Sequence, residues 1–298
     1  MKCAYCGKDG KGTKEHVISK SVLDLFPECY LTYDRRSRTG LYPSDPVIRD
    51  VCSECNNKRL SYIDSYAKTW VESNCLKRHG DADLTMIEYD YAMIQKMLLK
   101  YAFNSARYNG IPSNSFDTEI IDFLLNAQET TPKKYISILC GILPKVPPFL
   151  DEITGNQKIQ FSTNPIFVIE DTIESHNAHH EPKTIKLPDL KFSCVIRLGI
   201  IQFVILCWQK DSSVIHENEV ILEKFYPYTL LNPANKSLLP ICTSELNYVK
   251  IEVILPVYDQ SFRMSKIRKI SHPELYSSHL YEMWQEEEAK IAKKHPRK

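Results

Sequence analysis

The chain lacks a long uninterrupted hydrophobic run. Its longest apolar stretch, residues 194–208, is interrupted by Arg197 and is shorter than the roughly 20 residues that a membrane-spanning helix needs. The first residues, Met1 to Gly12, are polar and lysine-rich and contain no apolar segment of the kind found in secretory signals. We therefore expect no membrane association and a cytoplasmic location.

A strong net charge is also missing. The chain has 38 Lys and Arg against 37 Asp and Glu, and a net charge of +1 indicates no particular partner. The charge is uneven, because residues 1–80 hold 14 basic against 10 acidic residues, net +4, which leaves −3 for the rest. Such basic clusters can hold phosphates, although a solvated lysine-rich face is the alternative. The clustered basic residues include Arg35, Arg36, Arg38, Lys58 and Arg59.

Several enzyme signatures are absent as well. We find no glycine-rich phosphate loop, no serine-hydrolase elbow and no internal repeat. The sequence therefore gives no reason to expect nucleotide or ester chemistry in its later part. At 298 residues and 43% hydrophobic, the chain can bury a sizeable core and is expected to divide in two.

Cysteine, by contrast, is present in a specific pattern. Cys3 and Cys6, then Cys52 and Cys55, form two Cys-x2-Cys pairs whose four thiolates can enclose one zinc ion tetrahedrally. A zinc site filled by protein sulfur leaves no position for substrate, so this metal is expected to be structural. Free thiols are the alternative, and disulfides are less favoured because the other cysteines are scattered, several within apolar runs.

Between the two pairs lies the segment Lys14-Glu15-His16-Val17-Ile18. An ionisable pair followed by an apolar pair fits the end of a short strand whose tip carries functional groups. A neutral imidazole at His16 can accept a proton from a water molecule that attacks a phosphodiester. A further zinc ligand or a buried structural histidine is the alternative, disfavoured because four cysteines already complete the zinc.

The attack on a phosphodiester needs a cation. A hard divalent ion such as Mg²⁺ prefers oxygen ligands, and the Glu15 carboxylate with the Asn56 carbonyl oxygen would supply two of them. Asn56 and Asn57 follow the second cysteine pair and lie in the first turn of a predicted helix with a stop near Gly80. With Asn56 bound to the cation, Asn57 would cap the helix or support Asn56, and the alternative is that the asparagine serves only as the N-terminal cap. The apolar residues at helical spacing are Leu60, Ile63, Ala67, Trp70 and Val71.

The order of these motifs resembles the zinc-bearing HNH endonucleases, in particular the branch with Cys-Asn where others have Cys-His. The resemblance covers roughly residues 1–65. It implies two strands followed by a helix that clasp a catalytic divalent metal, Mg²⁺ or Mn²⁺, beside the zinc and cut DNA. Proteins similar to this family belong to restriction, mobile-element or phage-defence systems, which implies a sensing or docking role for the later part of the chain.

The chain departs from the family pattern at two positions. Most relatives carry Asp before the histidine, where this chain has Glu15, which is longer by one methylene. No asparagine stands between Gly40 and Asp50, the middle position of the usual signature. Ser44 or Asp45 could substitute there by bonding backbone groups, as short polar side chains do in turns.

We predict an α+β protein in which residues 1–80 form a small zinc-stabilised ββα-metal (HNH) domain. Residues 81–298 are predicted to form a mixed helical and antiparallel-sheet domain that recognises substrate, partner or signal. A capping-box pattern at residues 85–88 predicts a helix that closes near Asn109 and Gly110, and a second helix is expected over about residues 116–128. A last helix is predicted after Ser271. Strands are predicted at 135–143, 159–170, 192–209, 220–226 and 248–257.

Two functions of different class follow from these features. The first is a metal-dependent DNA endonuclease that uses His16, Glu15 and Asn56, with DNA contacts from the basic residues named above. The second is a non-catalytic, zinc-stabilised module that binds nucleic acid or protein. In either case, residues 81–298 are expected to bind a protein partner or a second copy of the chain.

Overall fold

The computed structural model describes residues 1–25, 32–33, 41–42, 46–76, 86–112, 115–142, 165–177, 180–199, 201–223 and 228–238. These residues form a mixed α/β structure with antiparallel sheets, which confirms the broad fold class that the sequence predicts. Several predicted features lie outside the described residues. They are Arg35, Arg36, Arg38, Ser44, Asp45, the strand at 248–257 and the helix after Ser271.

The N-terminal part is built on one antiparallel pair of strands and a later helix. Strand β1 (Gly12–His16) pairs antiparallel with β4 (Val47–Cys52), and the short helix α1 (Lys20–Leu23) follows β1. The π-helical turn η1 (Cys55–Arg59) then leads into α2 (Ser61–Asn74). A further two-stranded pair joins β2 (Thr32–Tyr33) to β3 (Leu41–Tyr42). The expected pair of strands and the later helix are present, with α1, β2 and β3 between β1 and β4, and their identity as an HNH fold stays a prediction.

Helix α2 buries the residues that the spacing singled out. Ile63, Ala67, Trp70 and Val71 are all buried, at the i, i+4, i+7 and i+8 positions of one helix face. The helix ends at Asn74, before the predicted stop at Gly80, which lies outside the described residues.

Helix α3 (Tyr91–Tyr108) is the central helix of the molecule and is buried on nearly every side. Its predicted start was wrong. Residues Ile87–Glu88 form strand β5, which pairs with the distant β13 (Ser237–Leu238), and Asp90 caps the helix by accepting a hydrogen bond from the Met93 N–H at 3.1 Å. Pairing with a strand far along the chain therefore overrides the local capping signal. The predicted end is confirmed, with Asn109 as the C-cap.

A five-stranded antiparallel sheet forms the other half of the described structure, in the order β12-β6-β11-β10-β7. Its strands are β6 (Ile136–Ile142), β7 (Ile166–Val168), β10 (Leu190–Leu198), β11 (Ile201–Trp208) and β12 (Thr229–Leu230). Every residue of β6 and β11 is buried, which explains why their sequences are continuous apolar runs instead of alternating patterns. The strand prediction at 135–143 and the helix prediction at 116–128 are confirmed, the latter as α4 (Thr118–Leu125).

Two predicted elements of this half are corrected by the structure. The single strand predicted over 192–209 is a hairpin of β10 and β11, because the chain reverses at Gly199. The strand predicted over 220–226 is wrong, since helix α6 (Ile215–Glu223) covers most of it. Asn218 and Leu222, four residues apart, are the buried residues of α6, and the Asn218 side chain donates to the Pro188 carbonyl at 2.8 Å. This bond joins α6 to the turn before β10.

Gly199 is required for the β10–β11 reversal. Its φ is 59°, in the left-handed region, and a Cβ at this position would lie 2.2 Å from the Cys75 carbonyl oxygen at the end of α2. The left-handed conformation alone costs a non-glycine residue about 1–2 kcal/mol, and the overlap adds to that cost. We expect Gly199→Ala to lower the free energy of unfolding, measured in urea, by more than this amount. Gly10→Ala is the matched control, because a Cβ there meets nothing within 4 Å. Equal stability of the two variants would contradict the assignment.

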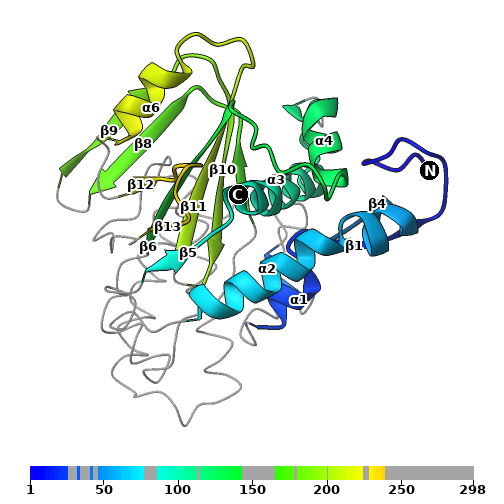
Figure 1. Ribbon diagram of the computed structural model, residues 1–298. Coiled ribbons are helices and arrows are strands. Elements are labelled where there is room, and N and C mark those ends of the chain that lie inside the picture. The colour runs from blue at the N-terminus through cyan, green and yellow to red at the C-terminus, as the bar shows by residue number, and fades with distance from the viewer. Residues whose placement is uncertain are drawn as a thin grey trace.

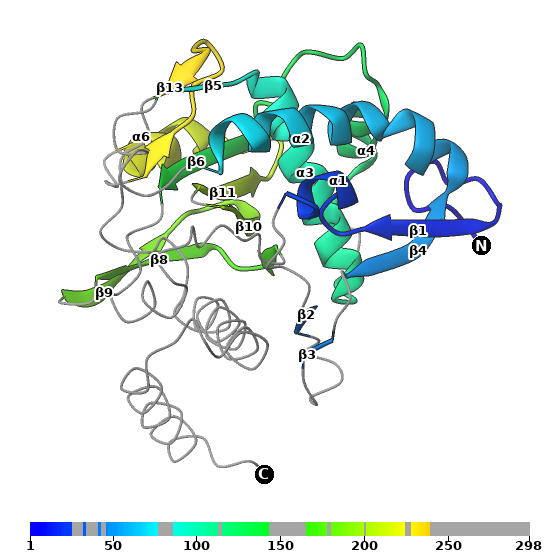
Figure 2. The ribbon, with the colours of Figure 1, turned by 90° about the horizontal axis from the view of Figure 1, so that it is seen from below.

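The helices lie between the two strand systems. Figures 1 and 2 show β1 and β4 at one end of the molecule and the large sheet at the other, with α2 and α3 between them. The remaining described pair, β8 (Thr172–Asn177) with β9 (His180–Lys186), extends beyond the sheet. No helix among the described residues is long and apolar enough to cross a membrane.

One apolar core spans both halves of the described chain. Tyr5, in the first cysteine loop, packs edge-on against Phe103 of α3 with ring centroids 5.1 Å apart. Trp70 of α2 contacts Phe203 of β11 with centroids 5.6 Å apart. The predicted domain boundary at residue 80 stays a prediction, because residues 77–85 lie outside the described residues. The packing shows that residues on either side of it share a core.

Candidate metal centre and adjoining polar site

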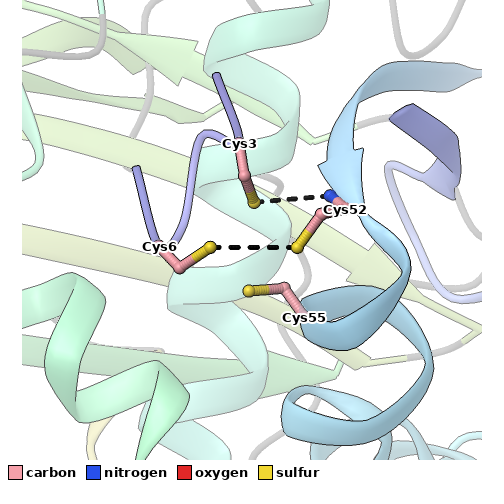
Figure 3. A group of neighbouring side chains, drawn as sticks. All are labelled: Cys3, Cys6, Cys52 and Cys55. Atoms are coloured by element: carbon pink, nitrogen blue, oxygen red, sulfur yellow. Dashed lines mark hydrogen bonds between the residues drawn. The ribbon is translucent and has the colours of Figure 1, made fainter. Parts of the chain in front are cut away.

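Four cysteine sulfurs meet where the N-terminal loop faces the end of β4 (Figure 3). The Sγ atoms of Cys3, Cys6, Cys52 and Cys55 all lie within 4.8 Å of one another, and those of Cys6 and Cys52 are 3.8 Å apart. Tetrahedral zinc with Zn–S bonds of about 2.3 Å separates its sulfurs by about 3.8 Å, whereas a disulfide brings two sulfurs to about 2.05 Å. The four free cysteines can therefore hold a metal ion such as zinc.

Main-chain hydrogen bonds shape the first cysteine pair. Gly7 has a φ of 68°, which lets the loop turn back so that its N–H donates to the Cys3 carbonyl at 2.9 Å. The Cys3 N–H donates to the Lys8 carbonyl at 3.0 Å, and the Ala4 N–H donates to the Asp50 carbonyl at 2.8 Å. The last of these bonds fastens the loop to β4 and brings its sulfurs to the second pair.

Two of the four thiols, Cys3 and Cys55, have pKa values shifted in opposite directions. Burial raises the pKa of Cys3, but N–H groups that donate to its sulfur, that of Cys52 at 3.3 Å among them, outweigh burial and lower the pKa to about 6. Burial and the neighbouring sulfurs raise the pKa of Cys55 far above its usual value. A divalent cation bound by the four sulfurs would favour the thiolate form of each, because a metal-bound cysteine is deprotonated.

The second cysteine pair lies at the junction of β4 and η1. Cys52 ends the strand and Cys55 begins the π-helical turn, in which the Leu60 N–H donates to the Cys55 carbonyl at 2.9 Å. Single π turns within helices are frequent at functional sites. Here the turn sets Asn56 against β1.

Asn56 bonds an irregular point of the β1–β4 ladder. The register shifts between Thr13 and Glu15, and the Asn56 Nδ2 donates to the Lys14 carbonyl at 2.9 Å and to Thr13 Oγ1 at 3.0 Å. A carbonyl can only accept, so the amide nitrogen must face β1, and the Asn56 carbonyl oxygen is the atom left to bind a cation. Neither asparagine acts as the N-cap that we considered, because Glu54 holds that position without a side-chain capping bond. Asn57 donates to Ser53 Oγ at 2.9 Å.

Glu15 and His16 lie on opposite faces of β1, because side chains alternate along a strand. His16 is half-buried, whereas Glu15 is only 3% exposed and faces α3. The His16 carbonyl accepts a hydrogen bond from the Asn104 side chain of α3 at 3.0 Å. The structure therefore brings Glu15, His16 and Asn56 to one short strand and its adjoining turn, and separates the two ionisable side chains.

The Glu15 carboxylate is part of a buried charged group. The Lys100 ammonium lies 2.8 Å from Glu15 Oε1 and 2.6 Å from Asp64 Oδ1, and the Lys100 side chain is fully buried. Burial alone would lower the pKa of Lys100, but the carboxylates of Asp64 and Glu15 outweigh burial and raise it. Lys100 therefore stays charged at neutral pH. The predicted contact of Glu15 with a catalytic cation stays a prediction; in this arrangement a lysine occupies one side of the carboxylate.

Sequence reasoning missed the contribution of α3. Lys96, Lys100, Asn104 and Arg107 follow one another at spacings of four, four and three residues within a largely apolar helix, and all four are buried or partly buried. Such a polar stripe on a buried helix signals a polar partner, because unpaired polar groups are costly in a core. The partners of that stripe could not be identified from sequence.

The predicted DNA-contacting residues are only partly described. Lys58 and Arg59 are exposed in η1, and the Lys58 ammonium lies 2.9 Å from Glu54 Oε2, in an exposed ion pair that leaves both side chains mostly in solvent. Salt bridges of this kind are weak, so a phosphate can compete for the lysine.

No protein-family model, curated protein or solved structure matches this chain. Assignment of a function therefore depends on the chemistry of the residues themselves.

Proposed function

We propose that the chain is a metal-dependent endonuclease of the HNH type, which hydrolyses phosphodiester bonds in DNA. The observation that carries the proposal is the joint placement of His16 and Asn56. Both belong to a small β1–β4–η1 unit closed by the four cysteines, and the Asn56 amide donates to the Lys14 carbonyl, two residues before His16. Zinc bound by the cysteines would hold this unit together and take no part in the reaction.

The proposed reaction is the hydrolysis of one P–O bond. The His16 imidazole accepts a proton from water as the water oxygen bonds to phosphorus, the bond to the leaving sugar oxygen breaks, and that oxygen takes up a proton from solvent. A divalent ion, Mg²⁺ or Mn²⁺, would offset the negative charge that develops on the phosphate. The chain's ligands for that ion would be the Asn56 Oδ1 and the Glu15 carboxylate. Lys100 and Asn104 both contact Oε1, so Oε2 would be the Glu15 oxygen to bind the ion.

A non-catalytic binding module is the second candidate, and one observation favours it. Glu15 is buried beside a lysine, an environment that already satisfies much of its charge. In that case the four-cysteine unit would serve as a rigid platform with Lys58 and Arg59 on its exposed side.

Replacement of His16 separates these two candidates. We expect the purified protein to convert supercoiled plasmid into nicked or linear forms in the presence of Mg²⁺ or Mn²⁺. The His16→Ala variant should cleave about 10² to 10⁴ times more slowly, which is the usual cost of losing a general base. Zinc content and melting temperature should match the parent. His216→Ala is the matched control, because His216 is an exposed histidine of α6.

The alternative outcomes are equally informative. Cleavage by His16→Ala at the parental rate would exclude His16 as the base. Absence of cleavage by the parent with either ion, together with retained DNA binding, would favour the binding module.

A further inference from the structure

Asn104 of α3 connects the candidate metal centre to the strand that carries His16. It is fully buried, yet its amide contacts five residues from three separate segments. The Nδ2 group donates to the His16 carbonyl at 3.0 Å and to Glu15 Oε1 at 3.2 Å. These two partners follow one another on β1, so a single side chain fixes both the main chain of His16 and the side chain of its neighbour.

The other half of the amide faces the cysteine loop and β4. Asn104 Oδ1 accepts from the Tyr5 hydroxyl at 2.8 Å and from Arg107 Nη2 at 2.6 Å. Tyr5 stands between Cys3 and Cys6, and Arg107 in turn donates to Asp50 Oδ1 on β4 at 2.7 Å. Both sides of the amide are therefore engaged, and its orientation is set because the carboxylate and the carbonyl can only accept.

We propose that Asn104 is a positioning residue, which holds the main chain of His16 in fixed relation to the four-cysteine group. The proposal rests on the proposed function and deepens it. A hydrogen-bonded amide at this point resists sliding of β1 along α3, which would otherwise move the imidazole relative to Asn56. Small displacements of this kind are costly, since a misplacement of about 1 Å can lower a rate about 100-fold.

A buried amide on the same helix provides the comparison for a purely structural role. Gln95 is also fully buried, and its Nε2 donates to the Lys133 carbonyl at 3.0 Å while its Oε1 accepts from the Lys133 N–H at 2.7 Å. Gln95 thus ties α3 to the segment before β6, away from β1. Loss of stability without loss of positioning is expected when Gln95 is replaced.

The test compares Asn104→Leu, Gln95→Leu and Tyr5→Phe in plasmid cleavage with Mg²⁺. For Asn104→Leu we expect kcat to fall about 10- to 100-fold, with KM and zinc content unchanged. Gln95→Leu should keep kcat within about twofold of the parent at a temperature where both are folded. Tyr5→Phe removes only the hydroxyl that donates to Asn104, keeps the ring against Phe103, and should give an intermediate kcat. If Asn104→Leu does not fold, Tyr5→Phe tests the proposal in its place.

A readout that does not need cleavage accompanies the kinetics. In protein labelled with ¹⁵N-histidine, the His16 amide signal, assigned by its loss in His16→Ala, should shift in Asn104→Leu and Tyr5→Phe and stay in place in Gln95→Leu. An unmoved His16 signal, or equal kcat values for Asn104→Leu and Gln95→Leu, would overturn the proposal. A parent protein that does not cleave DNA would refute the proposed function alone, because the His16 signal still reports the position of β1.

Discussion

Cys52→Ser is expected to release the metal and unfold the β1–β4–η1 unit. Structural zinc contributes on the order of 10 kcal/mol or more to the folding of small metal-binding segments. The four sulfurs close the loop that carries Tyr5 onto β4, so their release also frees a partner of α3. Elemental analysis should find about one zinc per chain in the parent and none in the variant. Hydrogen exchange should become fast in β1 and β4 and remain slower in β10 and β11, whose strands pair with each other.

Cys140→Ser is the matched control for this result. Cys140 is buried in β6, and burial raises its pKa as expected for a thiol in an apolar core. Its replacement should leave the zinc content unchanged. Acidification should also release the metal from the parent, because protons compete with it for the thiolates. A parent protein purified without chelators that contains no metal would contradict the assignment of the four cysteines.

Lys100→Met is expected to lower the free energy of unfolding by about 3–5 kcal/mol at pH 7, the usual cost of leaving a buried charge without its partner. The variant leaves the carboxylates of Glu15 and Asp64 close together without the ammonium that joins them. Burial already raises the pKa of Asp64 in the parent, and loss of Lys100 should raise it further. A carboxyl group whose pKa is raised in the folded state stabilises that state at low pH. This stabilisation is lost as the pH rises through the folded-state pKa. The difference in free energy of unfolding between variant and parent, measured in urea, should therefore shrink as the pH is lowered from 7.

Lys96→Met is the matched control, one turn earlier on the same helix. Lys96 is equally buried, but its ammonium donates to the Asn126 carbonyl at 2.7 Å and lies over the Tyr62 and Phe123 rings. Within the described residues it forms no salt bridge, and burial lowers its pKa. Its replacement leaves no unpaired carboxylate. We therefore expect a much smaller loss in the free energy of unfolding, and one that does not change with pH between 7 and the lower values tested. Similar losses for both variants would show that Lys100 acts through packing alone.

Local patterns in the sequence predicted the parts of the site whose geometry is local. The spacing of two Cys-x2-Cys pairs indicated a four-sulfur group, because each short turn aims two sulfurs in one direction. The buried face of α2 and the apolar strand β6 followed from the periodicity of their own residues. Placement of Asn56 in the first turn after Cys55 followed in the same way, although its bond to the Lys14 carbonyl did not.

Contacts between distant residues were decided only by the tertiary structure. The residues of the capping pattern before α3 form a strand that pairs with residues 237–238. The residues near 220, predicted as a strand, form helix α6. Glu15 pairs with Lys100, 85 positions along the chain, and His16 is bonded by Asn104. No local pattern encodes such pairs, because the energy that fixes a buried charge or amide depends on which polar group the folded chain brings to it.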